Sequence, residues 1–464
     1  MPNSLAFLML AAWPVVTVVL FRRMPPDRAL IISMVAGYLF LPEPPATYDF
    51  PLLPPLSKHN IPALTSFVCI LWMYGIKGSL LPESLSARLL SLIFIFSPAL
   101  TVVTNVDPVF WGEIGLPGLG WKDAIALTMT QFLILIPFLL ARQHLATGGS
   151  QRSLLMALMV GGLVYSVLML IEMRLSPQLN LWVYGYYQHF FGQSIRFGGY
   201  RPVVFLYHGL WVAFFALTAV VGAWALWKFD IGGNRKKLFF AAVYLTVVLV
   251  LAKSLGALIF AAIILPVLIF TGSKTQIKVA VVIGVLALGY PILKGTELVP
   301  EKYLLTKAAE IDPDRAASLD FRFTNENILL DRAYQKPWFG WGSWGRNHIL
   351  DPVTGILLTV TDGRWIITIG VYGWIGFIAE FGLLILPLLL LLREALAFRR
   401  SEVSKFIAPL SLILAVNVFD MIPNATLTPL TWLVAGALTG YAEALKKARL
   451  TEGPRVQPEW KPVI

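Results

Sequence analysis

The sequence from Trp365 to Leu392 reads WIITIGVYGWIGFIAEFGLLILPLLLLL, and Glu380 is its single charged residue. A helix of this length and composition is long enough to cross the roughly 30 Å hydrocarbon core of a bilayer. Because a charge inside such a helix is costly, we expect Glu380 to have a partner or a proton. The stretch therefore indicates an integral membrane protein.

The rest of the chain has the same character. Of its 464 residues, 57% are apolar and 14% are charged, and the mean hydropathy is +0.72. Soluble domains contain roughly a quarter charged residues. The single cysteine, Cys69, cannot form an internal disulfide or a cysteine metal site, and no other convincing metal cluster is present. The first apolar segment lacks the basic start and cleavage site of a signal peptide, so we expect it to be a membrane span.

Apolar runs long enough to span recur along the whole chain, and together they predict an all-α polytopic integral membrane protein with about 12–13 transmembrane helices. The thirteen candidates are 4–21, 29–42, 61–80, 88–104, 123–141, 153–171, 203–227, 237–252, 255–271, 278–294, 365–392, 406–420 and 428–445.

Lysine and arginine in short loops predict the orientation, because short cytoplasmic loops carry an excess of positive charge. Twenty-two of the 37 basic residues fall on alternate connections, including the C-terminal tail. This set comprises Arg22, Arg23, Arg28, Lys77, Arg88, Arg142, Arg152, Lys228, Arg235, Lys236, Lys237, Lys274, Lys278, Arg393, Arg399, Arg400, Lys405, Lys446, Lys447, Arg449, Arg455 and Lys461. We expect the N-terminus outside and the C-terminus in the cytoplasm. Topology thus accounts for most of the net charge of +11, and a nucleic-acid partner is excluded.

Two long segments are expected to face outward, 172–202 and 295–364. The predicted organisation is a bundle over 1–294, with about ten spans and the aromatic external loop 172–202, then an external cap over 295–364. Spans and a cytoplasmic tail follow over 365–464. The aromatic residues of 172–202 suit a helix lying along the lipid headgroups. The cap should contain a helix from Ser318 to Gln335 that is ended by Pro337.

The sequence WFGWGSWG follows this helix and is too rich in glycine for regular structure. Trp338, Trp341 and Trp344 recur in it at every third residue. Their flat rings could bind a sugar or could anchor the loop at the membrane interface. Arg332, just before them, could bind the same substrate or could be solvated beside Asp331.

Four cations are predicted at one membrane face: Arg201, Lys253, Arg322 and Arg364. Guanidinium groups bind phosphate in a bidentate manner, so together they predict a diphosphate site. Each has a simpler alternative, which is an interfacial side chain or, for Arg322, an ion pair with Glu326 one turn along the helix. His208 is expected about two turns inside the span that begins near residue 203, where it could bind substrate or bond a neighbouring helix.

Three side chains could accept a proton: His348, which titrates near neutral pH, Asp362, which precedes a span, and Glu380. None of them lies in a motif with diagnostic spacing.

Four pieces occur in an order that resembles the bacterial O-antigen ligase and O-antigen or exopolysaccharide polymerase (Wzy-type) family. They are YRPVVFLYHG (200–209), AKSLGAL (252–258), RFTNENILLDRAYQKPWFGWGSWG (322–345) and YGWIGFIAEFGLL (372–384). The sequence LPPLSKHNIPAL (53–64) also looks like polymerase-type relatives.

The resemblance implies a GT-C-like glycosyltransferase of the bacterial inner membrane whose substrate is an undecaprenyl-diphosphate-linked oligosaccharide. An acceptor hydroxyl would attack the anomeric carbon, and arginines would stabilise the leaving diphosphate. No cofactor is implied, and the reaction is expected to be metal-independent. The lipid bilayer is another expected partner. The resemblance also implies chain-length regulator and export proteins as further candidates.

The chain departs from the family at one place, because relatives often have a histidine before the span where this chain has Asp362. His348 lies fourteen residues earlier, so the identity of the proton acceptor stays open. Polymerase and ligase differ only in the acceptor, and the LPPLSKHN sequence favours a polymerase. A transporter or flippase for an anionic lipid-linked saccharide is the rival class, although no internal repeat supports it.

Overall fold

A computed structural model describes residues 1–464 except 76–77, 197, 231, 399–402 and 453–464. The described part is mostly helical, as the sequence predicts. Five residues of the predicted cytoplasmic set lie outside the described residues: Lys77, Arg399, Arg400, Arg455 and Lys461.

Most of the chain forms one bundle of helices with a continuous apolar core. The helices that precede the cap are α1 (Ser4–Arg23), α2 (Pro26–Phe40), α3 (Ile61–Tyr74), α4 (Leu85–Val103), α5 (Trp121–His144), α6 (Gly148–Leu175), α7 (Leu179–Tyr184), α8 (Gly209–Lys228), α9 (Arg235–Leu251), α10 (Leu255–Phe270) and α11 (Ser273–Gly295). The helices of the cap are α12 (Glu301–Ile311) and α13 (Pro313–Tyr334), and those after it are α14 (Arg364–Ala397), α15 (Ile407–Asp420) and α16 (Pro429–Glu452). The closest packing joins α5 to α16, α11 to α15, α6 to α8 and α8 to α9.

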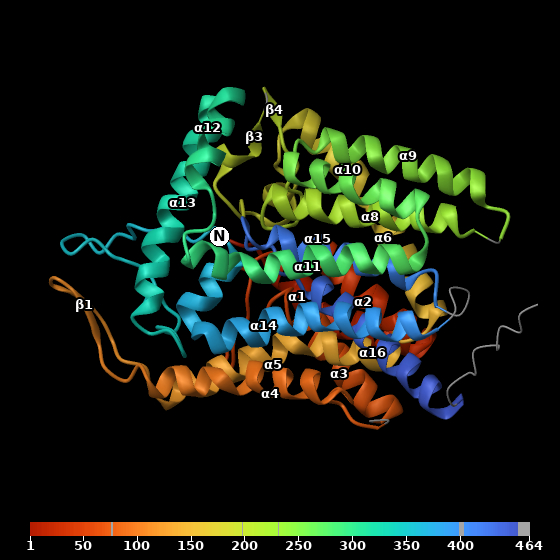
Figure 1. Ribbon diagram of the computed structural model, residues 1–464, viewed down its shortest axis with the longest axis horizontal. Helices are drawn as coiled ribbons and strands as arrows, with labels where there is room; N and C mark the ends of the chain where they lie inside the picture. Colours follow the sequence, from red (N-terminus) through yellow and green to blue (C-terminus); the bar gives the residue numbers. More distant parts are fainter. Residues whose placement is uncertain (76–77, 197, 231, 399–402, 453–464) are drawn as a thin grey trace, which may run out of the picture.

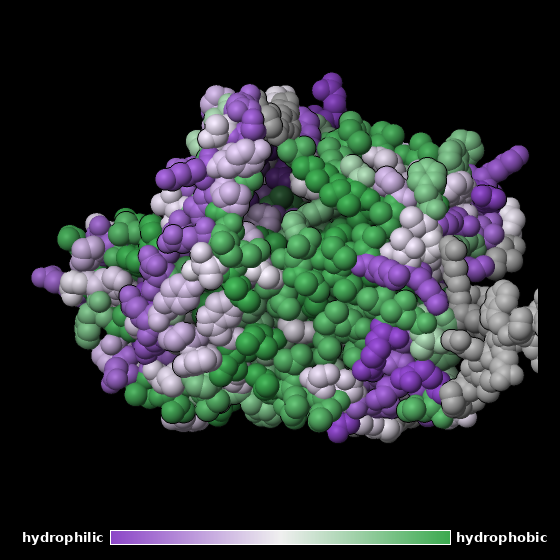
Figure 2. Space-filling view, in the orientation of Figure 1, coloured by the Kyte–Doolittle hydropathy of each residue, from purple (hydrophilic) through white to green (hydrophobic). Residues whose placement is uncertain are grey.

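In the described part of the chain, seven helices are long and apolar enough to cross a membrane: α1, α4, α5, α6, α8, α11 and α14. Three shorter apolar helices, α3, α10 and α15, lie among them. Figure 2 shows a broad hydrophobic band over the side of the bundle, between hydrophilic side chains at its two ends. A soluble protein rarely exposes apolar surface on this scale. The architecture is therefore consistent with a helical membrane protein.

The cap (residues 295–364) stands across one end of the bundle, where the N-terminus also lies (Figure 1). Helix α13 begins five residues before the expected Ser318, because Asp312 caps its N-terminus through the backbone N–H of Asp314 and Pro313 occupies its first turn. A hairpin of β1 (Val109–Trp111) and β2 (Ile114–Leu116) projects from the same end.

The glycine-rich sequence of the cap is irregular, as expected, and it pairs with a break in α14. At Gly373 the backbone leaves the helical conformation (φ 68°, ψ −170°). The carbonyl groups freed by this break accept hydrogen bonds from Trp341 N, to Gly370 O (2.8 Å), and from Gly342 N, to Val371 O (2.9 Å). Trp374 N donates in return to Pro337 O (2.8 Å). The cap is thus bonded to the first third of a long apolar helix, since freed backbone groups in such a helix need partners within the protein.

The neighbouring aromatic loop contains a short helix, but the expected position of His208 is wrong. Within the described part of 172–202, Leu179–Tyr184 form an α-helix beyond the end of α6, and a short hairpin of β3 (Ile195–Arg196) and β4 (Gly199–Tyr200) follows it. His208 does not lie two turns inside a helix, because α8 begins at Gly209 and His208 is its N-cap residue. Residues 201–208 instead form an irregular connection at the cap end of the bundle.

Candidate functional site

The loop after α15, residues 421–428, organises the cap end of the bundle. Asp420, the last residue of α15, accepts hydrogen bonds from Asn424 Nδ2 (2.9 Å) and Thr426 Oγ1 (2.7 Å). Asp420 also interacts electrostatically with Arg201 and with Arg322. One buried carboxylate therefore lies within electrostatic range of two of the four predicted cations.

Arg322 reaches this loop from α13. Its Nη1 donates to the carbonyl of Pro423 (3.3 Å), and its Nε lies 3.4 Å from Oδ2 of Asp362. The alternative ion pair between Arg322 and Glu326 is not observed, because Glu326 faces Lys294 (3.7 Å) and accepts a hydrogen bond from Tyr290. Arg322 and Asp362 remain about one-third exposed, so both are accessible to a ligand.

Arg201 is the most unusual cation of the group. It is 5% exposed, and its Nε has no hydrogen-bond partner among the described residues. Burial, together with repulsion from Arg196, lowers its pKa to about 10, so the guanidinium stays charged at neutral pH. Its side chain passes directly over Gly209, where a Cβ atom would lie 2.6 Å from Arg201 Cδ. A buried cation with an unused donor is a candidate for binding an anion.

His208 lies beside Arg201 but cannot accept a proton in this geometry. Its Nδ1 accepts a hydrogen bond from Leu210 N (3.1 Å), so its Nε2 must be the protonated nitrogen that faces Gln193 Oε1 (3.0 Å). Burial, with repulsion from Arg201, lowers the pKa of His208 to about 3. The ring is therefore neutral at ordinary pH and caps α8.

Lys253 lies at the turn between α9 and α10, as the sequence predicts, with a positive φ of 53°. Its Nζ donates to the carbonyl of Arg196 (3.1 Å) in the hairpin that leads to Arg201. A Cβ atom on Gly199 would meet Lys253 Nζ. Lys253 thus packs against the chain that carries Arg201 rather than standing apart from it.

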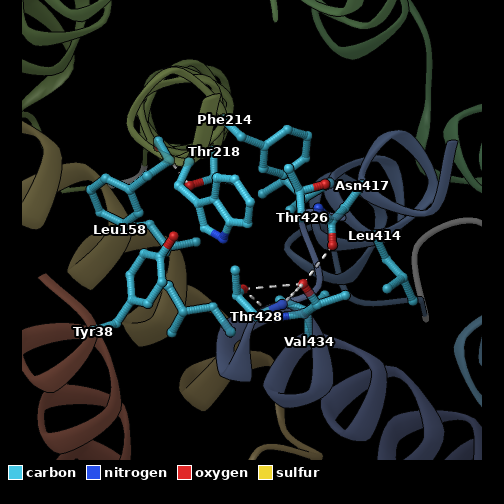
Figure 3. Close-up of a pocket in the computed structure, with 14 residues that line it drawn as sticks. Tyr38, Leu158, Phe214, Thr218, Leu414, Asn417, Thr426, Thr428 and Val434 are labelled. Carbon is cyan, nitrogen blue, oxygen red and sulfur yellow. Dashed lines mark hydrogen bonds between the residues drawn. The ribbon is translucent and has the colours of Figure 1, made fainter. Parts of the chain in front are cut away.

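Figure 2 shows the surface hollowed between the cap helices and α10, with hydrophilic side chains inside the hollow. A narrow apolar crevice lies inside the bundle between α2, α6, α8, α15 and α16 (Figure 3). Thr426, which bonds Asp420, lines it, and so does Trp211, whose ring contacts that of His208. The charged cluster, by which we mean Arg201, Arg322, Asp362 and Asp420, therefore borders the crevice.

Arg364 and Glu380, which both lie on α14, form an ion pair. Arg364 donates from Nε to Oε1 of Glu380 (2.7 Å) and from Nη2 to Oε2 (2.5 Å). Thr368 Oγ1 adds a third bond to the carboxylate (3.0 Å), and Glu380 is fully buried. The expectation that Glu380 needs a partner is confirmed. Because the pair is satisfied internally, the geometry favours a structural role for both residues over proton transfer or diphosphate binding.

Arg332 and Trp341 form a second assembly, at the end of α4. The Arg332 guanidinium lies 3.3 Å from the ring centre of Trp341 and 5.0 Å from that of Trp111. Trp341 Nε1 donates to the carbonyl of Arg332 (2.7 Å). Burial and the nearby Arg346 lower the pKa of Arg332 to about 10. These contacts favour a structural role for Arg332 and Trp341, rather than a solvated arginine or a sugar-binding ring.

The other two tryptophans of the motif remain available to a ligand. Trp338 is 66% exposed and Trp344 is 56% exposed, whereas Trp341 is 8% exposed. The regular spacing in the sequence therefore does not mean that the three rings have one common role.

His348 and Asp362 lie at the two ends of one non-helical segment of the cap, residues 348–362. His348 Nδ1 lies 3.1 Å from Oγ1 of Thr359, and burial lowers its pKa. In the same segment, the N–H of Val360 donates to Asn325 on α13 (2.7 Å). Two residues later, Asp362 lies beside Arg322. Of the three predicted proton acceptors, Asp362 is the one that contacts Arg322.

Sequence reasoning missed the contribution of Asp420, Asn424 and Thr426. Asp420 ends an apolar run, and an ionisable residue at the end of a predicted span was a usable signal. The sequence gives no indication that the same carboxylate interacts electrostatically with residues 201 and 322, because that proximity depends on tertiary packing. Comparison with known proteins adds no identification: the chain matches no protein-family model and no curated protein.

Proposed function

We propose that the protein is a membrane glycosyltransferase of GT-C-like architecture that polymerises undecaprenyl-diphosphate-linked glycan repeat units at the external face of the bacterial inner membrane. The observation that carries the proposal is the buried Arg201 guanidinium, with its unused Nε donor. Arg201 and Arg322 both interact electrostatically with Asp420, and Thr426, which bonds Asp420, lines an apolar crevice. A lipid diphosphate has the matching chemistry, because it combines an anionic head with an apolar chain.

In this scheme Arg201 and Arg322 bind the diphosphate, and Asp420 orients the two guanidinium groups. The acceptor hydroxyl attacks the anomeric carbon, a new C–O bond forms, and the bond from that carbon to the diphosphate oxygen breaks. The electron pair of the broken bond leaves on the lipid diphosphate, where the arginines stabilise the developing charge. Asp362 takes the hydroxyl proton.

The predicted topology supports this orientation. The cap end of the bundle carries the N-terminus, and α16 ends at the opposite end (Figure 1). Short loops with an excess of lysine and arginine are predicted at that opposite end, which we assign to the cytoplasm. The glycan would then lie under the cap beside the exposed rings of Trp338 and Trp344. The bilayer supplies the lipid-linked substrate, and we expect neither a metal nor a cofactor.

The test is a transfer assay with purified protein in lipid nanodiscs, undecaprenyl-diphosphate-linked repeat units and a chelator. Longer glycans are expected on a gel. Arg201→Ala and Arg322→Ala should each slow elongation by at least about 10²-fold, the usual effect of removing one electrostatic stabiliser of the transition state. Gly289→Ala is the control, because a Cβ atom at this helical position meets nothing within 4 Å.

Elongation at the wild-type rate by both arginine variants would contradict the site assignment. Transfer of single units to a lipid A core sugar, without elongation, would replace the polymerase with a ligase. Movement of the lipid-linked substrate across the bilayer without any transfer would favour the transporter class.

A further inference from the structure

The connection between β4 and α8 includes four residues, 203–206, that are buried and not helical. Val204 in this segment has a positive φ of 51°, which strains a β-branched residue. Irregular backbone in the interior of a membrane bundle must find partners for its polar groups within the protein. The partners of this segment are therefore informative.

Buried side chains from neighbouring elements accept the N–H groups of this segment. Oε2 of Glu172, near the end of α6, accepts from Val203 N and from Val204 N, both at 2.8 Å. The hydroxyl of Tyr165, also on α6, accepts from Phe205 N at 2.9 Å. Glu172 is 1% exposed and Tyr165 is fully buried.

Two further buried side chains donate to the carbonyl groups. Nε2 of Gln188 bonds Val204 O (2.9 Å) and Leu206 O (2.8 Å), and Nζ of Lys58 bonds Phe205 O (2.7 Å). The charge of Lys58 is balanced by a carboxylate at 3.1 Å, that of Glu43. Burial alone would raise the pKa of Glu43, but Lys58 and the neighbouring histidine lower it to about 2.

Stability alone does not require these buried polar side chains. An extra helical turn at the start of α8 would satisfy the same backbone groups without any buried polar side chain. The irregular path instead turns the chain so that Arg201 lies across Gly209 and His208 caps α8. The buried polar groups thus hold the two ends of the segment at the candidate site.

We propose that Lys58, Tyr165, Glu172 and Gln188 are positioning residues, which hold segment 203–206 so that the Arg201 guanidinium points at the diphosphate of the substrate. The proposal rests on the proposed function. It assigns a role to the LPPLSKHN sequence, because Lys58 lies within it.

The test uses the full-length protein in detergent and measures two quantities on the same samples. Hydrogen–deuterium exchange reports the amides of 203–206, and equilibrium binding uses farnesyl diphosphate as the probe. The variants are Glu172→Gln, Tyr165→Phe and Arg201→Ala. The control is Glu394→Gln, which also removes a buried carboxylate (1% exposed); this one is ion-paired with Arg449 and lies near the C-terminal end of α14, away from the cap.

Glu172→Gln should speed exchange of the 203–206 amides and weaken farnesyl diphosphate binding, each by roughly tenfold or more, since charged hydrogen bonds contribute about 1.5–3 kcal/mol. Tyr165→Phe removes a single bond and should show the same pair of changes at smaller amplitude. Glu394→Gln should change neither quantity. If Glu172→Gln fails to fold, Tyr165→Phe decides the matter alone.

Two results would overturn the inference. One is unchanged protection of these amides, and the other is loosened amides with wild-type affinity for farnesyl diphosphate. The Arg201→Ala variant separates the two proposals. Wild-type affinity in this variant contradicts the proposed function. Lost affinity in Arg201→Ala with wild-type affinity in Glu172→Gln and Tyr165→Phe overturns the inference alone.

Discussion

The break in α14 offers a quantitative test of how the cap is attached. Gly373 has a backbone conformation that is essentially restricted to glycine. A Cβ atom at this position would lie 2.3 Å from the carbonyl carbon and oxygen of Trp338. The Gly373→Ala substitution must therefore strain the backbone and push the cap away from the helix. The nearest hydrogen bonds at risk are Trp374 N to Pro337 O (2.8 Å) and Ile375 N to Trp338 O (3.3 Å).

The expected cost can be estimated from these contacts. A non-glycine residue in such a conformation costs about 1–3 kcal/mol. Loss of two backbone hydrogen bonds adds about 1–3 kcal/mol. The free energy of unfolding of Gly373→Ala should thus fall by about 2–6 kcal/mol.

The assay is denaturant unfolding of the purified protein in detergent, followed by tryptophan fluorescence because Trp338 and Trp374 flank the contact. Gly289→Ala is the matched control, since this helical glycine has open space around it. Alanine should there be neutral or should stabilise by up to about 1 kcal/mol. If Gly373→Ala unfolds at the same denaturant concentration as wild type, the proposed attachment of the cap to the break is incorrect.

Three further predictions concern stability and the roles of single side chains. Glu380→Ala removes the buried carboxylate that pairs with the partly exposed Arg364 and should destabilise the protein by about 3–5 kcal/mol in the same unfolding assay; a change below about 1 kcal/mol contradicts the internal pairing. Acidification from pH 6.5 to 4.5 should cost about 2 kcal/mol through His208, because burial lowers its pKa from 6.5 to about 3 and the unfolded state binds the proton first. His208→Asn keeps the helix cap and should flatten this pH slope in thermal melts, and an unchanged slope rejects the assignment. Trp341→Ala should destabilise by about 3–5 kcal/mol. Trp338→Ala should change stability by less than about 0.5 kcal/mol but slow glycan elongation, and equal effects of the two tryptophan substitutions would contradict their different roles.

The apolar runs predicted the class of fold because hydrophobic length is a local property. Each predicted span corresponds to at least part of a helix, but α14 also contains a break that its apolar composition conceals. His208 was misplaced for the same reason. Residues 203–208 are apolar enough to continue a helix, yet buried side chains from distant parts of the chain bind their backbone in another conformation.

The sequence predicted some single residues of the candidate site but not how they are arranged in space. Arg201 and Arg322 were found because cations in an apolar sequence at a predicted membrane face are unusual. Arg332 and Trp341 share that sequence signature but stack on each other, and only the packing of the cap distinguishes the two cases. Asp420 was missed because its importance comes from electrostatic interactions with two residues that are distant in the sequence.

The central claim, that Arg201 binds a lipid diphosphate, is tested most directly by equilibrium binding of farnesyl diphosphate, farnesyl monophosphate and farnesol. The informative variant is Gly209→Ala, because the added Cβ would lie 2.6 Å from Arg201 Cδ and 2.7 Å from its Nε. The substitution displaces the guanidinium without removing its charge, and Gly289→Ala serves as the control. We predict that wild type binds the diphosphate tightest and that Gly209→Ala weakens this binding at least about tenfold, a loss of about 1.4 kcal/mol, while farnesol binding stays the same. Farnesol binding as tight as that of the diphosphate, or unchanged diphosphate binding in Gly209→Ala, would contradict the claim.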